Sequence, residues 1–209
     1  MSRKLGGGLA AIGNTPLVRL GPVVPDGAAE VWVKLEGANP TGSYKDRMAI
    51  ALVANGVERG DIRPGDTLVE FTGGSTGTAL AFVAAVYGVE FTAVFSDAFS
   101  ASKQQAMEAF GATVLVEPSV DGTITNELAE RMRVRAHTLA AEPGHVYADQ
   151  FGSPDVREGY RPMGEEIGTA LDHIDVFCAA VGTGGALMGA LDGLHANGHA
   201  PDVVALEPT

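Results

Sequence analysis

The sequence has only one cysteine and no long apolar run, and these two features exclude several classes of protein. Cys178 cannot form an internal disulfide, and its place in the apolar run 176–181 predicts a buried core thiol. No histidine stands near it in a pattern that favours a catalytic thiolate. No stretch is long enough to cross a membrane, and the N-terminus lacks the apolar core and cleavage site of a secretory signal. We therefore expect a cytoplasmic protein with no membrane partner.

Positive charge is also scarce. The 14 Lys and Arg residues stand against 26 Asp and Glu residues, and the formal net charge of -12 repels nucleic-acid backbones and anionic lipids. No nucleic-acid partner is expected. The five histidines give no metal-binding pattern, because Gly198 and Pro201 interrupt the helix that His195 and His199 would need to share. No metal site is predicted.

Hydrophobic residues make up 45% of the 209 positions, which is enough for a real core. Short apolar runs alternate with longer helix-like segments, an order typical of an α/β fold with a mostly parallel sheet and helices on both faces. Strands are predicted at 16–20, 30–35, 67–71, 91–95, 113–116, 176–181 and 203–206. Helices are predicted at 44–59, 76–87, 102–110, 125–140, 159–171 and 185–196. No helix follows the last strand, so we expect either a fragment or an unusually bare sheet.

Two glycine-rich turns each follow a predicted strand and open a predicted helix. They are Thr72-Gly73-Gly74-Ser75-Thr76-Gly77 and Gly182-Thr183-Gly184-Gly185. Backbone N–H groups at such a helix start converge on one point, so either turn suits a carboxylate or a phosphate. An ordinary tight connection explains each turn alone equally well. The first has no following lysine for a P-loop and the second has the wrong glycine spacing for a dinucleotide site, so a kinase or dehydrogenase is disfavoured.

Lys45 is the candidate for covalent chemistry. Ser43 and Asp46 have the spacing of a capping box, which places Lys45 in the first turn of a helix. A cation is electrostatically disfavoured at that positive helix end, and the pKa of the amine is lowered there, as a Schiff-base amine requires. On this segment alone, a surface lysine beside Asp46 is an equal alternative.

Several segments, in order along the chain, resemble the cysteine synthase and cystathionine beta-synthase family. They are 12–20 (Ile-Gly-Asn-Thr-Pro-Leu-Val-Arg-Leu), 39–47 (Asn-Pro-Thr-Gly-Ser-Tyr-Lys-Asp-Arg), 72–77, 111–112, 149–151 (Asp-Gln-Phe) and 182–185. The resemblance implies a homodimeric fold type II pyridoxal phosphate enzyme with two doubly wound open-sheet domains. The small domain with the substrate loop would span 37–148, and the large domain with the phosphate loop would comprise 1–36 and 149–209. The large domain would be incomplete, because the family's chain continues past Thr209 to further strands and to a Ser or Thr that bonds the pyridine nitrogen.

The resemblance also implies roles for individual residues. Lys45 would be the Schiff-base lysine and the catalytic base. The cofactor, pyridoxal 5'-phosphate, would be bound by Lys45, Ser75, Gly182, Thr183, Gly184 and Gly185. The substrate carboxylate would be bound by Thr72, Gly73, Thr76 and Gln150. Three positions depart from the family pattern: Ser75 replaces an asparagine, Gly73 replaces a serine, and Ala186 replaces a threonine that would add a phosphate hydrogen bond.

The implied reaction is a β-replacement on an activated serine. O-acetylserine or phosphoserine would react with sulfide to give cysteine. The alternatives are another β-replacement or elimination, such as cystathionine or diaminopropionate formation, and an inactive truncated relative.

Overall fold

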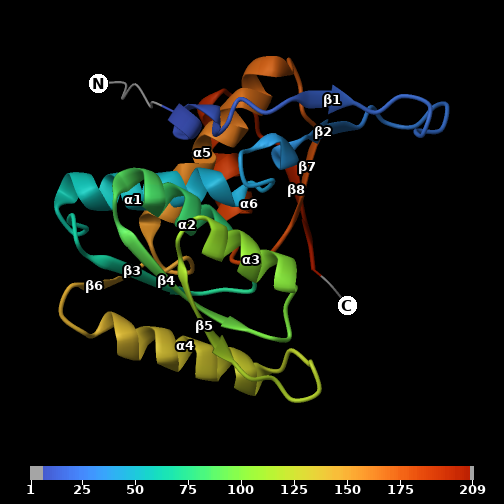
Figure 1. Ribbon diagram of the computed structural model, residues 1–209. Helices are drawn as coiled ribbons and strands as arrows, with labels where there is room; N and C mark the ends of the chain where they lie inside the picture. The colour runs from blue at the N-terminus through green and yellow to red at the C-terminus, as the bar shows by residue number, and fades with distance from the viewer. Residues whose placement is uncertain (1–6, 208–209) are drawn as a thin grey trace.

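The computed structural model describes residues 7–207, in which helices and strands alternate (Figure 1). The strands are β1 (Leu17–Arg19), β2 (Trp32–Lys34), β3 (Thr67–Phe71), β4 (Glu90–Ser96), β5 (Thr113–Glu117), β6 (His145–Tyr147), β7 (Val176–Ala180) and β8 (Asp202–Leu206). The α-helices are α1 (Lys45–Arg59), α2 (Ser75–Tyr87), α3 (Ala101–Ala109), α4 (Asn126–Ala140), α5 (Pro154–Ala170) and α6 (Gly185–Ala196). Two short 3-10 helices, η1 (Gly7–Ala11) and η2 (Glu36–Ala38), precede α1. Within residues 7–207, none of the helices is long and apolar enough to span a membrane.

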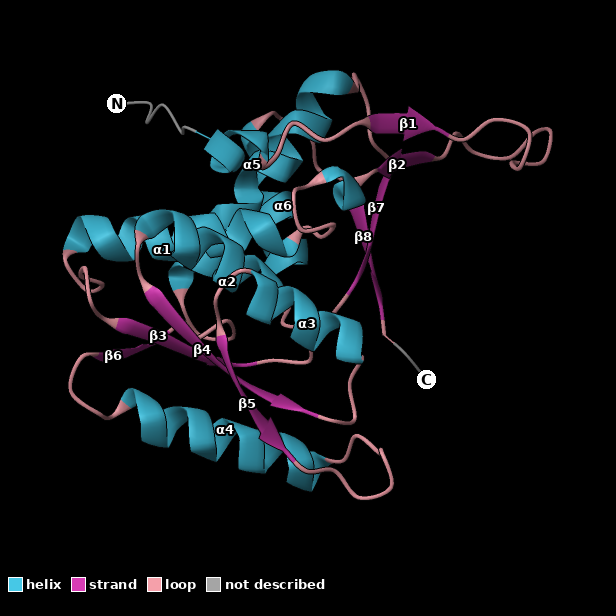
Figure 2. Cartoon of the chain, in the orientation of Figure 1, coloured by secondary structure: helices cyan, strands magenta, loops and turns pink. Residues whose placement is uncertain are grey.

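The largest sheet has four parallel strands in the order β5-β4-β3-β6. Helices α2 and α3 lie on one face and α4 lies on the other (Figure 2). Leu68, Val69 and Glu70 on the central strand β3 are fully buried, because both faces are covered. The predicted α/β fold with a parallel sheet is confirmed. Since the strands run the same way, the turn after β3 and the segment after β6 leave the sheet at the same edge, where such folds bind ligands.

Helices α1, α5 and α6 form a second layer, in which α5 packs against both α1 and α6. Glycines permit this packing. A Cβ atom on Gly164 of α5 would overlap the carbonyl oxygen of Ala190 on α6, and one on Gly193 would overlap the carbonyl oxygen of Arg161. The two helices are therefore in backbone contact, and α5 fixes where α6 begins.

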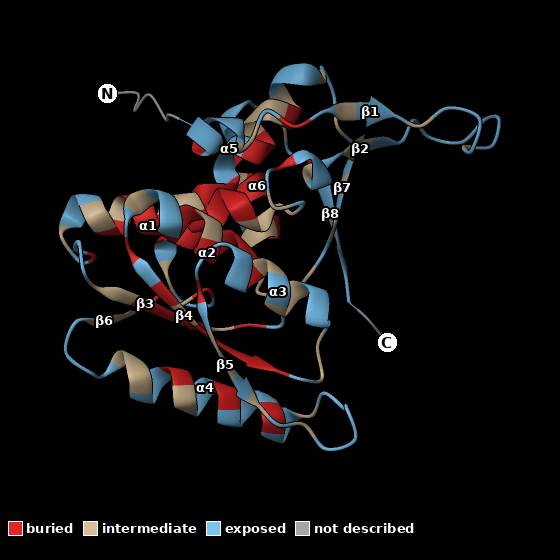
Figure 3. Cartoon of the chain, in the orientation of Figure 1, coloured by how far each residue is buried: buried red, intermediate tan, exposed pale blue. Residues whose placement is uncertain are grey.

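The other two sheets have two strands each and are open to solvent. β1 and β2 pair antiparallel, and β7 and β8 pair parallel. Every residue of β8 is exposed (Figure 3). A mainly apolar hollow of about 940 Å³ borders β2, β7 and α5. Cys178 lies on β7 and is exposed, so the prediction of a buried thiol is wrong. An apolar run predicted the strand, but the open sheet leaves alternate side chains uncovered.

Candidate active site

Lys45 is the first residue of α1 and so lies in the first helical turn, as predicted, but the capping box is not formed. The N-cap is Tyr44, and the Lys45 N–H donates to Ser43 Oγ at 3.2 Å. The Asp46 carboxylate instead accepts from the N–H (2.8 Å) and the hydroxyl of Thr41. Lys45 Nζ lies 4.7 Å from the centroid of the Tyr44 ring. Burial lowers the pKa of Lys45, which favours the neutral amine that covalent chemistry needs.

A buried ion cluster holds the turn that carries Lys45. The Arg47 guanidinium is 3% exposed and donates to Glu36 (Nε to Oε2, 2.7 Å) and to Glu166 on α5 (Nη1 to Oε1, 2.7 Å). Lys34 Nζ lies 2.6 Å from the second Glu166 oxygen. Although burial opposes it, hydrogen bonds from Arg47 and Lys34 lower the pKa of Glu166 to about 2. The cluster thus ties α1, β2 and α5 together around the candidate site.

The turn after β3 is shaped by one hydroxyl. Thr72 Oγ1 accepts the N–H groups of Gly74 (3.0 Å) and Gly77 (3.1 Å), and its own proton remains to donate elsewhere. Gly74 has φ +140°, which a residue with a side chain rarely adopts. A Cβ atom on Gly73 would stand 2.9 Å from the ring of Phe99, which fills the space beside the turn. The turn therefore presents backbone and hydroxyl donors at the start of α2.

Gln150 is held against this turn by three bonds. Thr76 Oγ1 donates to Gln150 Oε1 (2.7 Å), and Gln150 Nε2 donates to the Phe71 carbonyl (2.9 Å). The Gln150 N–H donates to Glu70 Oε2 (2.9 Å), and the preceding residue, Asp149, has φ +56°. Burial raises the pKa of Glu70 to about 7. These partners fix the Gln150 amide and leave its second N–H free to point into the site.

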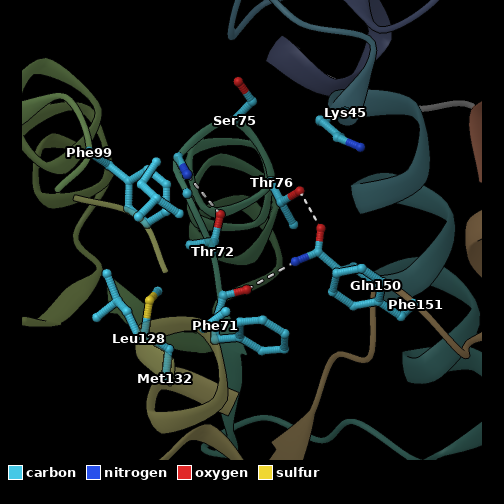
Figure 4. A pocket seen from close by; sticks show the side chains of 14 residues that line it. Lys45, Phe71, Thr72, Ser75, Thr76, Phe99, Leu128, Met132, Gln150 and Phe151 are labelled. Atoms are coloured by element: carbon cyan, nitrogen blue, oxygen red, sulfur yellow. Dashed lines mark hydrogen bonds between the residues drawn. The ribbon is translucent and has the colours of Figure 1, made fainter. Parts of the chain in front are cut away.

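One cavity of about 340 Å³ gathers most of the predicted residues (Figure 4). Its polar wall includes Lys45, Thr72, Gly73, Ser75, Thr76 and Gln150. Its apolar wall includes Phe71, Phe99, Ile124, Leu128, Met132 and Phe151. The cavity at the carboxyl edge of the sheet therefore combines an amine, several hydrogen-bond donors and an apolar wall. This combination suits a small amino-acid ligand.

The second glycine turn does not line this cavity. It joins β7 to α6, its Gly184 has φ +80°, and no side chain caps the helix that starts at Gly185. The backbone N–H groups at the α6 start are thus available to an anion. Tyr160 connects the two regions, because its ring lies beside Gly185 and packs against Tyr44.

The comparison with known families decides the assignment. A family model described as "Pyridoxal-phosphate dependent enzyme" matches residues 9–209. The chain belongs to this family. The cofactor prediction is thereby confirmed at the level of the family, as is the resemblance seen in the sequence.

Relatives within the family include cysteine synthases. Cysteine synthase B of Salmonella typhimurium is 37% identical over 199 residues, which are 94% of this chain and 64% of that protein. A cysteine synthase of Staphylococcus aureus is 38% identical over 200 residues, with 94% and 63% covered. The chain thus spans less than two thirds of the length of these relatives.

Solved structures of the family have the same fold. The crystal structure of an O-ureido-L-serine synthase matches with a TM-score of 0.88 at 35% identity, covering 99% of this chain and 64% of that one. The crystal structure of a cysteine synthase from Entamoeba histolytica matches with a TM-score of 0.80 at 31% identity, covering 93% and 58%.

The residues present fit pyridoxal phosphate. Lys45 offers an amine whose pKa is lowered by burial, and the α6 start offers uncapped N–H donors. A Cβ atom on Gly182 or Gly184 would meet nothing within 4 Å, so there is open space beside the turn. A phosphate needs such space and such donors.

Proposed function

We propose that this chain carries the cofactor and substrate sites of an enzyme that makes cysteine from an activated serine and sulfide. The observation that carries the proposal is that Lys45, the 72–76 turn and Gln150 line the same cavity. The named relatives support cysteine formation over the alternative β-replacements and eliminations. O-acetylserine or phosphoserine is the proposed donor.

The substrate carboxylate would be held by the polar wall. The free proton of the Thr72 hydroxyl, the second N–H of Gln150 and the N–H groups at the α2 start all lie on that side. Charge-assisted hydrogen bonds of this kind are short and directional, so three of them would fix the amino acid in one orientation. The carboxylate site would then set which bond at Cα faces Lys45.

Lys45 Nζ would move the Cα proton. Pyridoxal phosphate, when bound, supplies a conjugated ring that accepts the electrons released as this proton leaves. The chain's part is to supply a base that is neutral near pH 7, and burial lowers the pKa of Lys45 in that direction. The apolar wall of Phe99, Leu128 and Met132 would keep water from competing with sulfide. The turn 182–185 would hold the cofactor phosphate.

We also propose a homodimer, a cytoplasmic location and the two-domain division at 37–148. The family resemblance supports the first and third, and the lone cysteine, which cannot form an internal disulfide, fits the second. Gel filtration, fractionation and limited proteolysis would test them in turn.

The reaction is tested by supplying O-acetylserine or phosphoserine with sulfide and measuring cysteine. Thr72→Val removes the hydroxyl at nearly the same size, and we expect it to raise the KM for the donor at least tenfold, or about 1.4 kcal/mol. Thr169→Val is the matched control, because Thr169 is exposed on α5 and donates to the Glu165 carbonyl. No cysteine from either donor, or an unchanged KM in Thr72→Val, would contradict the proposal.

A further inference from the structure

Tyr160 on α5 is buried without satisfying its own polar group. The residue is 0% exposed, and its hydroxyl has no hydrogen-bond partner among the described residues. Buried hydroxyl groups in proteins nearly always have a partner, because leaving water without a replacement bond is unfavourable. The unpaired hydroxyl is therefore a candidate to bind a ligand.

The ring of Tyr160 runs along α6 toward the first residue of that helix. A Cβ atom on Gly189 would lie 2.7 Å from the Tyr160 Cβ, and one on Gly185 would lie 3.7 Å from Tyr160 Cε2. The outer end of the ring, which bears the hydroxyl, is thus at the start of α6. On the other side the ring packs at 5.6 Å against Tyr44, the residue before Lys45. The ring that bears the hydroxyl consequently lies between the start of α6 and Tyr44.

The glycine turn supplies donors that also lack a side-chain partner. No side chain caps α6, Gly184 is left-handed, and the space beside Gly182 and Gly184 is open. Ala186 carries a methyl group and offers no hydroxyl to a ligand in this turn. The Tyr160 hydroxyl is on the neighbouring helix, in reach of the same place. Burial, followed by the charges of Tyr44, Glu36 and Asp46, raises its pKa, so the group keeps its proton and can donate.

We propose that the Tyr160 hydroxyl donates a hydrogen bond to the phosphate of bound pyridoxal phosphate, in addition to the backbone donors of the 182–185 turn. The inference rests on the proposed cofactor site. It makes Tyr160 a cofactor-binding residue that reaches the phosphate from α5.

The test is the affinity for cofactor in Tyr160→Phe, measured by equilibrium binding without substrate. The variant loses one oxygen and keeps the ring, and the hydroxyl bonds nothing else in the described chain, so the cofactor-free protein should unfold at the same denaturant concentration as the wild type or at a higher one. Pyridoxal phosphate should bind about tenfold more weakly or worse. Pyridoxal, which has no phosphate, should bind both proteins equally. Tyr87→Phe, at the far end of α2, is the matched control and should leave both affinities unchanged.

Two results would overturn the inference: equal affinity of Tyr160→Phe and wild type for pyridoxal phosphate, or an equal loss of affinity for both ligands, which would reflect packing of the ring. Borohydride reduction of the wild type separates this from the proposed function. Label on Lys45 with no effect of Tyr160→Phe defeats the Tyr160 role alone, whereas wild-type protein that takes up no cofactor defeats both.

Discussion

Replacing Arg47 by methionine should strongly destabilise the protein. Arg47 makes two-pronged contacts to both Glu36 and Glu166, with four N···O distances of 2.7–2.8 Å, and its side chain is 3% exposed. Methionine fills much of the same volume but removes the charge that pairs with both carboxylates. Glu166 then keeps its contact with Lys34, and Glu36 loses its ion pair. Breaking a buried ion pair from one side costs about 3–5 kcal/mol. Because the carboxylates are 12% and 19% exposed, we expect the lower end, about 3 kcal/mol.

Urea unfolding at pH 7 measures this loss. Arg133→Met is the matched control, since Arg133 pairs with Glu130 at 2.6 Å on an exposed helix face, where solvent screens the pair and its loss should change the stability little. The pKa of Glu166 is held near 2, so its stabilising contribution is present above its ordinary pKa of 4.5 and lost as the pH falls toward 2. The difference in the free energy of unfolding between wild type and Arg47→Met should therefore become smaller below pH 4.5. A loss in Arg47→Met no larger than that in Arg133→Met would refute the reasoning.

Three further substitutions test other parts of the structure. Burial raises the pKa of Glu70 to about 7, so the native state binds a proton that the unfolded chain has released. The free energy of unfolding should fall as the pH rises from 4.5 to 7, by about 3 kcal/mol at most, and a Glu70→Gln variant that keeps this slope would contradict the assignment. Gly73→Ser should cost about 1–3 kcal/mol in thermal unfolding, because its Cβ would press on Phe99; an unchanged Tm would show that the ring moves freely. Gly164→Ala should lower the stability at least as much, because the new Cβ would overlap the Ala190 carbonyl oxygen and force α5 away from α6. Near-wild-type stability in urea would be incompatible with backbone contact between the helices.

Local patterns predicted most of the fold. The strand at 67–71 and the helix at 185–196 were found with the observed bounds, because glycine or proline marks their ends and apolar residues fill them. β6 was missed, since three residues give no periodicity and the strand exists through its pairing with β3. Helix α5 begins at Pro154, five residues before the predicted start, and the Ser153-Pro154 pair was the signal for it.

The site depended on pairings that are distant in the sequence. Arg47 and Glu166 are 119 residues apart, and Glu70 and Gln150 are 80 apart, so no local pattern relates them. Tyr160 gave no sequence signal, because its unpaired hydroxyl is visible only when its neighbours are placed. Lys45 stood out in the sequence, but its partners in the cavity were indicated by family resemblance and then brought together by the fold.

The central claim is that pyridoxal phosphate binds covalently to Lys45, and one labelling measurement tests it most directly. The chain has four lysines, Lys4, Lys34, Lys45 and Lys103, so peptide mapping after borohydride reduction identifies the labelled residue without ambiguity. We predict label on the Lys45 peptide, no label in Lys45→Ala, and unchanged label in Lys103→Ala. Label on another lysine in the wild type, or label that persists in Lys45→Ala, would contradict the account.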